Sequence, residues 1–341
     1  MSSEQRCVQA LNGALHELFA ARDDVYLIGE DLLDPYGGAF KVSAGLSSRW
    51  PERVLPTPVS EASMFGIAAG FALRGYRPIV EVMFGDFVTL GFDQIVNGIS
   101  KFREMFDEQA TVPLVVRTPM GGRRGYGPTH SQSLEKLLLG VPGIVVVAPS
   151  EHHDLGAMLV AAVEDDRPVF FVENKLMYTR PNRRPRDGWV DEFRVAEGDG
   201  PWPALTFSGN GFERAEATLV TYGGSLPVAL DAARQLILEE EIFTEVVALG
   251  RLLPLDLDPV LESVRRTGAL VTVEEGTLTA GIGAEIAARV QERAWGDLRA
   301  PVRRVAARDG IVPSARPLED EMLPGPGDVV AAVESLGAAA R

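Results

Sequence analysis

The sequence predicts an α/β protein with two domains, each a mainly parallel sheet with helices on both faces. Apolar, strand-like runs alternate with helical patterns along most of the 341 residues. These runs are apolar at consecutive positions, which is typical of parallel strands buried on both faces. The alternation stops once, in a stretch rich in proline, glycine and charge. We therefore expect a first domain at 1–180, a connector at 181–216 and a second domain at 217–341.

The first half begins with an amphipathic helix, which places Val8, Leu11, Leu15, Leu18 and Phe19 on one face. Strand patterns then follow at 25–29, 78–84, 112–118, 143–149 and 168–174. Helical patterns at 92–106 and 152–166 lie between strands. Strands separated by helices are the pattern of a parallel sheet, because a parallel pair needs a long crossover connection.

The second half repeats this alternation. Strand patterns occur at 217–223, 243–250, 268–276 and 301–307. Helical patterns at 226–241 and 281–294 separate them. A second α/β domain is therefore expected after the connector.

Composition and charge narrow the class of protein. Hydrophobic content of 46 % and charged content of 24 % are ordinary for a globular protein. A formal net charge of −15 argues against nucleic-acid binding, which needs clustered Lys and Arg. No apolar run approaches the roughly 20 residues that cross a bilayer, and the N-terminus shows no signal-peptide pattern. The single cysteine, Cys7, fits a reducing compartment, so we expect a cytoplasmic enzyme with no membrane role.

Three motifs that suggest a ligand site have simpler interpretations. "GGRRGYG" at 121–127 follows a strand, but its spacing is not GxGxxG, and Pro128 spoils a helix start that would cradle a phosphate. "GDG" at 198–200 resembles the start of a metal-and-diphosphate motif, but the asparagine that this motif needs is missing at the required distance. His152 and His153 are neighbours whose side chains point in different directions, so we expect no metal site there.

Several polar residues allow both a structural and a functional interpretation. Glu61 stands in the first turn of the apolar helix of "TPVSEASMFGIAAGFAL", where a carboxylate suits the helix dipole. His130 lies in a loop rich in glycine and proline, where the backbone can approach a ligand closely. Arg123 and Arg124 form a solvated charged loop, or else bind an anionic substrate group or an acidic partner.

Eight stretches taken in order resemble the beta subunit of the decarboxylating component of 2-oxo acid dehydrogenase complexes. They include "PTPVSEASMFGIAAGFALRGYRPIVEVMF", "GDFVTLGFDQIVN", "PTHSQSLEKLLLGVPGIVVVAPS", "RPVFFVENKLMY", "LVTVEEGTLTAGIGAEI" and "RPLEDEMLP". The resemblance covers most of the chain outside the connector. It implies a thiamine-diphosphate pyrimidine-binding domain followed by a transketolase C-terminal domain.

The resemblance also implies a role for each candidate residue. Glu61 matches the glutamate that hydrogen-bonds the pyrimidine nitrogen of thiamine diphosphate, so that the cofactor's imino nitrogen can take the proton from the thiazolium carbon. Phe87 matches the aromatic residue that lies against the aminopyrimidine, and Glu30 matches an acidic residue near the same ring. His130 matches the histidine that faces the reacting centre and assists acyl transfer to lipoyl.

Metals and partners are implied in the same way. The carbonyls of Ala162 and Val163, with the Asp165 side chain, match a structural potassium site, although Arg167 stands where some members have asparagine. Because the chain lacks a metal-and-diphosphate motif, the resemblance implies that an alpha subunit holds Mg2+ and the diphosphate in an α2β2 assembly, which a lipoyl acyltransferase core can join.

The expected function is therefore oxidative decarboxylation of a 2-oxo acid with acyl transfer to lipoyl. Two departures leave membership of a standard complex open, namely "DGIVP" at 309–313 in place of the family's DxPxP and a connector longer than usual. The alternatives are the C-terminal half of a split transketolase-like enzyme with a non-lipoyl acceptor and a non-catalytic scaffold paralogue.

Overall fold

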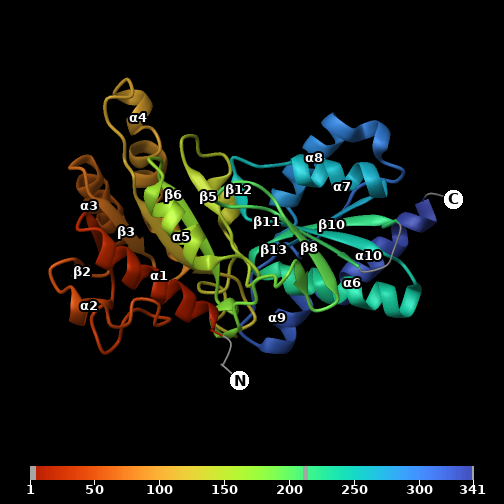
Figure 1. Cartoon of the computed structure of the whole chain (residues 1–341), viewed down its shortest axis with the longest axis horizontal. Coiled ribbons are helices and arrows are strands. Elements are labelled where there is room, and N and C mark those ends of the chain that lie inside the picture. The colour runs from red at the N-terminus through yellow and green to blue at the C-terminus, as the bar shows by residue number, and fades with distance from the viewer. Residues whose placement is uncertain (1–4, 210–213, 340–341) are drawn as a thin grey trace.

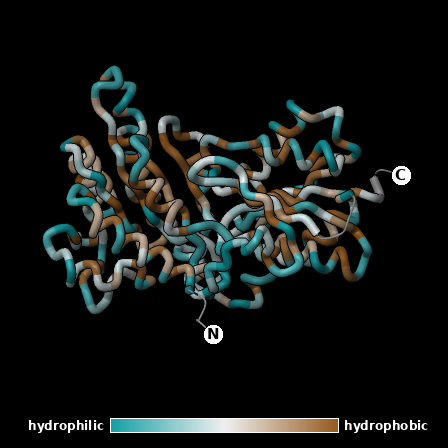
Figure 2. The backbone as a smooth tube through the Cα atoms, in the orientation of Figure 1, coloured by the Kyte–Doolittle hydropathy of each residue, from teal (hydrophilic) through white to brown (hydrophobic). Residues whose placement is uncertain are grey.

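The computed structural model describes residues 5–209 and 214–339. Two sheets, each with helices packed against it, lie next to each other, one in each half of the chain (Figure 1). Hydrophobic residues concentrate in the strands of both sheets, whereas hydrophilic residues predominate in the loops (Figure 2). In the described residues no helix combines the length and apolar character needed to span a membrane. The expected two-part α/β architecture is therefore confirmed.

The first sheet has seven strands in the order β12-β5-β6-β4-β3-β1-β2, and all neighbours are parallel except β12 and β5. Its strands are β1 (Val25–Gly29), β2 (Val54–Pro56), β3 (Arg77–Glu81), β4 (Val115–Met120), β5 (Val145–Val147), β6 (Val169–Asn174) and β12 (Arg251–Leu253). Helices α1 (Cys7–Ala21) and α5 (Leu155–Glu164) cover one face. Helix α3 (Glu61–Leu73) packs on the other face, so the sheet is buried on both sides.

The second sheet has the order β14-β13-β10-β11-β9-β8-β7. Its parallel strands are β10 (Ala217–Tyr222), β11 (Thr244–Leu249), β13 (Leu270–Thr277) and β14 (Arg303–Ala307). Helices α6 (Leu226–Glu240), α7 (Asp258–Thr267), α8 (Ile282–Ala294) and α10 (Pro326–Ala339) pack against it. Helix α9 (Arg316–Met322) contacts the 121–125 loop of the first half.

The segment 181–216, expected as an irregular connector, contains three strands of this second sheet. They are β7 (Trp189–Val190), β8 (Phe193–Glu197) and β9 (Leu205–Gly209), and all pair antiparallel. Phe193, Leu205 and Phe207 are buried at alternate strand positions, which is the period-2 pattern of a strand with one face in the core. Short strands between prolines, glycines and charges hide this alternation in the sequence, so the expectation of an irregular segment was wrong.

The helix expected at 92–106 is also broken. A π-helical turn, Gln94–Ile99, comes first, and a single α-turn, α4 (Phe102–Met105), follows. Asn97 and Gly98 lie in the π turn, and both have low helix propensity. The backbone therefore departs from regular α-geometry where the sequence supports it least.

The two halves of the chain share one hydrophobic core. Strand β12 belongs to the second half by sequence, but it pairs with β5 at the edge of the first sheet. Tyr222 and Leu249 of the second half lie in the same buried cluster as Val146 and Phe170 of the first. Groups on the facing sides of the two halves are therefore held at fixed positions.

Candidate active site

The candidate residues collect at the carboxyl ends of the first sheet's strands. Glu30 follows β1, Glu61 comes after β2 at the start of α3, and Phe87 follows β3. His130 lies in the loop after β4. Open parallel sheets bind ligands at this edge, because the loops that follow the strands converge there.

Glu30 and Glu61 form a buried acidic pair. Each is 4 % exposed. Burial, and then the charge of Glu61, raise the pKa of the Glu30 carboxyl above its usual range, and the backbone N–H of Ser60 opposes this shift. Glu30 Oε1 is buried without a hydrogen-bond partner among the described residues. A buried acceptor without a partner is costly, so this site favours a ligand that offers N–H donors.

Aromatic rings cluster around His130. The His130 ring lies 4.7 Å from the ring of Phe84 and 5.1 Å from that of Phe87, nearly perpendicular to both. His130 Nδ1 is 2.9 Å from the hydroxyl of Thr129, which fixes the orientation of the imidazole. The cluster provides flat apolar surfaces for a planar ring and one titratable nitrogen beside them.

A buried ion network, which the sequence interpretation missed, adjoins this aromatic cluster. Arg117 Nε and Nη2 each donate to Glu173 over 2.7 Å, and Nη1 donates to Glu81 over 2.9 Å. The Tyr178 hydroxyl donates to Glu173, and its ring packs on Phe40, which packs in turn on Phe84. One signal was available, because β3, β4 and β6 each place one of these charges among apolar residues.

The loop after β4 accounts for both arginines of "GGRRGYG". Arg123 donates to Asp320 and to the carbonyl of Pro324, both near the C-terminus. Arg124 Nη2 donates to the carbonyl of Lys175, and its guanidinium lies 6.0 Å from the ring of Phe40. Neither arginine is a freely solvated charge, and Arg123 serves to hold the loop.

The potassium ligands suggested by the resemblance already have other partners. Arg77 Nη1 donates to the carbonyl of Val163 over 3.0 Å and to that of Asp165 over 2.7 Å. The Asp165 side chain accepts from Arg167 Nε and Nη2. Val163 and Asp165 therefore already have guanidinium partners where the resemblance implies a cation. The potassium site stays a prediction, and no step is derived from it.

Other metal candidates have structural partners. His153 is buried, its ring nitrogens lie against Ser150 and the carbonyl of Pro203, and burial lowers its pKa to about 4. The "GDG" motif falls in the turn between β8 and β9. Within residues 5–209 and 214–339, no group of three or more His, Cys, Asp and Glu side chains is arranged to hold a metal ion.

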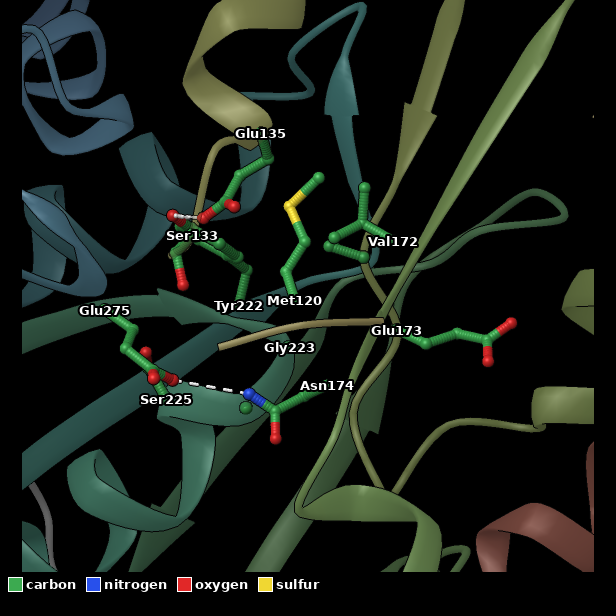
Figure 3. Close-up of a pocket in the computed structure, with 12 residues that line it drawn as sticks. Met120, Ser133, Glu135, Val172, Glu173, Asn174, Tyr222, Gly223, Ser225 and Glu275 are labelled. Atoms are coloured by element: carbon green, nitrogen blue, oxygen red, sulfur yellow. Dashed lines mark hydrogen bonds between the residues drawn. The ribbon is translucent and has the colours of Figure 1, made fainter. Parts of the chain in front are cut away.

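A small cavity of about 20 Å³ lies between the two halves and is lined by Met120, Glu135, Asn174, Tyr222 and Glu275, among others (Figure 3). Burial raises the pKa of Glu135 to about 7, and the Tyr222 hydroxyl donates to its carboxylate over 2.6 Å. Asn174 Nδ2 donates to Glu275 over 3.3 Å, which links β6 to β13. The volume is that of about one water molecule.

Comparison with known proteins identifies the class. The profile of the transketolase pyrimidine-binding domain matches residues 3–181, and that of the transketolase C-terminal domain matches residues 212–329. A split-gene transketolase solved as an inactive beta4 tetramer superposes with a TM-score of 0.75 at 23 % identity, covering 99 % of this chain and 100 % of that one. The fold is therefore transketolase-like.

Similarity to curated proteins is more specific. The chain is 37 % identical to the pyruvate dehydrogenase E1 component subunit beta of Rickettsia bellii, over 96 % of this chain and 97 % of that protein. It is 39 % identical to the corresponding subunit of Leifsonia xyli, over 96 % and 93 %. It is 36 % identical to the acetoin:2,6-dichlorophenolindophenol oxidoreductase subunit beta of Cupriavidus necator, over 95 % and 94 %. The chain belongs to the family of beta subunits of 2-oxo acid dehydrogenase-type oxidoreductases.

Proposed function

We propose that this chain, together with an alpha subunit, decarboxylates a 2-oxo acid with bound thiamine diphosphate and passes the acyl group to lipoyl. The observation that carries the proposal is the buried Glu30–Glu61 pair at the same edge of the sheet as the Phe87–His130 contact, in a chain that belongs to this family. The cofactor, when bound, supplies the electron sink for decarboxylation.

The residues present fit the pyrimidine end of that cofactor. The Glu61 carboxylate is 4 % exposed and lies beside Glu30, so a proton held between its oxygen and a ring nitrogen would be shielded from water. Burial strengthens this bond, because the low local dielectric favours a shared proton over two separated charges. Glu30 Oε1 offers a second acceptor at the same place, and the ring of Phe87 offers a flat surface.

His130 is the group that assists acyl transfer in this proposal. Its Nδ1 is engaged by Thr129, so Nε2 is the nitrogen that can hold or release a proton towards the acceptor thiol. Phe84 and Phe87 limit the rotation of the imidazole and exclude water from one side of it. Both effects keep the proton-transfer distance short.

The site needs a partner chain, and α3 presents a surface for one. Its inner face is buried through Met64, Phe65 and Ala68, whereas Gly66, Ile67 and Gly70 on the outer face are exposed. A Cβ built on either glycine meets nothing within 4 Å. Small and apolar exposed residues allow another helix to approach closely, which fits an α2β2 assembly in which the alpha subunit holds Mg2+ and the diphosphate.

The test is reductive acylation of a lipoyl domain by the reconstituted complex, with pyruvate, a branched-chain 2-oxo acid and acetoin as substrates. We expect lipoyl-dependent product from the wild type and a rate lower by about 10²–10⁴ for Glu61→Ala, the usual scale for loss of acid–base assistance. Glu17→Ala, on the exposed side of α1, is the matched control and should leave the rate unchanged. Acyl transfer that does not depend on lipoyl would instead support the split transketolase-like alternative.

A further inference from the structure

The loop that carries His130 has an unusual backbone. Four of its residues have positive φ, namely Gly121 (95°), Arg123 (66°), Gly125 (67°) and Gly127 (78°). Alternation between ordinary and left-handed residues turns successive N–H groups towards one side and forms a concavity that binds anions. Such a concavity commonly receives a phosphate, but in this chain it is filled from within.

The anion is supplied by the other half of the chain. Glu319, in α9, is fully buried, and its Oε1 accepts from Arg123 N over 2.7 Å while its Oε2 accepts from Gly125 N over 3.1 Å. Glu275, at the end of β13, accepts from Gly122 N over 2.5 Å and is itself held by Asn174 (Figure 3). The charge of Lys175 lies near Glu319, but the hydrogen bonds to the two Glu319 oxygens come from the loop. The Glu319 charge is therefore met by the N–H groups of the loop, through charge-assisted hydrogen bonds.

The fit between loop and acceptor is close. A Cβ at Gly122 would lie 2.8 Å from Glu319 Oε1, and one at Gly127 would lie 2.4 Å from the hydroxyl of Ser314. Outside the concavity, the Arg123 side chain donates to Asp320 on the same helix. These contacts explain why the loop is rich in glycine, and they exclude an added phosphate from the concavity.

The position of His130 depends on this loop. The backbone N–H of His130 donates to the carbonyl of Gly127, and Gly121 N donates to the carbonyl of Gln132. Gly127 lies two residues after Gly125, which Glu319 holds, and Gly121 precedes Gly122, which Glu275 holds, so the chain on both sides of the histidine is tied to neighbours of the held residues. We propose that Glu319 is a positioning residue that shapes the 121–130 loop and thereby sets His130 against Phe84 and Phe87. The role of His130 in this inference rests on the proposed function, whereas the contact between Glu319 and the loop does not depend on it.

The test uses the intact complex with its alpha subunit and compares Glu319→Ala and Glu319→Gln with Glu321→Gln, an exposed glutamate on the same helix that serves as the control. Three quantities are measured: amide hydrogen exchange of residues 121–130, kcat for lipoyl acylation, and the Kd for thiamine diphosphate. For Glu319→Ala we expect faster exchange in the loop and kcat lower by about 10²-fold, the scale that a misplacement of about 1 Å produces. Glu319→Gln keeps one acceptor oxygen, so its kcat should fall less than that of Glu319→Ala.

The Kd separates positioning from general damage. Glu30, Glu61 and Phe87 lie outside the loop, so the Kd should match that of the wild type in both Glu319 variants. The inference would be overturned if Glu319→Ala had the same kcat and the same loop exchange as the wild type. It would also be overturned if kcat, cofactor affinity and thermal stability all fell together in this variant. If the wild-type complex acylates no lipoyl domain, the proposed function is wrong. The exchange measurement then still tests whether Glu319 holds the 121–130 loop.

Discussion

At the scale of single residues, burial determines what each charged group does. Arg117 is 2 % exposed and is bound on both sides by carboxylates that are also buried. Burial raises the pKa of Glu81, whereas the neighbouring Arg117 charge lowers it. An ion network of this kind contributes little net stability over an apolar core, but losing one member is costly because the others stay buried and uncompensated.

Arg117→Met should therefore destabilise the fold strongly. We expect the free energy of unfolding to fall by about 3–5 kcal/mol, the scale for breaking a buried ion pair by removing one partner. Denaturation by urea measures it. Arg22→Met removes the partner of Asp24, in a pair whose side chains are about one-third exposed, and should cost less than about 1 kcal/mol. Equal losses in the two variants would contradict the importance assigned to burial.

At the scale of elements, α3 connects the site with assembly. Its first residue is the candidate catalytic Glu61, its inner face packs on the first sheet, and its outer face is exposed in the single chain. The helix is apolar almost all round, which is typical of a helix buried on all sides. An exposed apolar face of this kind indicates an interaction surface.

Ile67→Glu should block assembly without harming the chain. Ile67 is 47 % exposed, so a glutamate there should change the free energy of unfolding of the isolated chain by less than about 0.5 kcal/mol. In the assembled complex the new carboxylate would be buried without a partner, and we expect the α2β2 species to be lost in size-exclusion chromatography. Leu238→Glu, on α6 at 82 % exposed, is the control and should still assemble. Assembly of Ile67→Glu to the wild-type extent would contradict an interface on α3.

The elements also show what the sequence could predict. Long runs such as β4, β6 and β10 are recognisable because every residue is buried. Strands β7 to β9 were missed because their alternation is short and lies among glycine, proline and charge. Glu30, Glu61, Phe87 and His130 were found through the resemblance. Glu319 was not, because a glutamate that binds backbone N–H groups across more than 190 residues leaves no local pattern.

At the scale of the whole molecule, the two halves meet through a shared core and also through a buried polar contact, here called the seam, formed by Glu135, Tyr222 and Glu274. Glu135 of the first half and Tyr222 of the second share a hydrogen bond at this seam, and Glu274 lies 3.3 Å from the same hydroxyl. Burial raises the pKa of Glu135 from 4.5 to about 7. In the folded protein the protonated form of Glu135 therefore predominates below about pH 7.

This shift predicts how stability depends on pH. Between about pH 4.5 and 7 the folded protein binds the Glu135 proton more tightly than the unfolded chain does. The contribution of this proton to the free energy of unfolding is therefore fully present below about pH 4.5 and is lost as the pH rises through 7. Glu135→Gln is always neutral and should gain stability relative to the wild type between pH 5 and 8, by on the order of 1 kcal/mol or more. Thermal midpoints across that range measure it. A constant difference between the two proteins would contradict the raised pKa.

In the proposed function, Glu61 is the group that holds a proton at the cofactor's pyrimidine ring. The most direct measurement is the rate of deuterium exchange at the thiazolium C2 position of thiamine diphosphate bound to the complex, for the wild type and for Glu61→Gln at saturating cofactor. We predict that exchange in the variant is slower by about 10²–10⁴, the scale of acid–base assistance. Equal exchange rates with the cofactor fully bound would contradict the role assigned to Glu61.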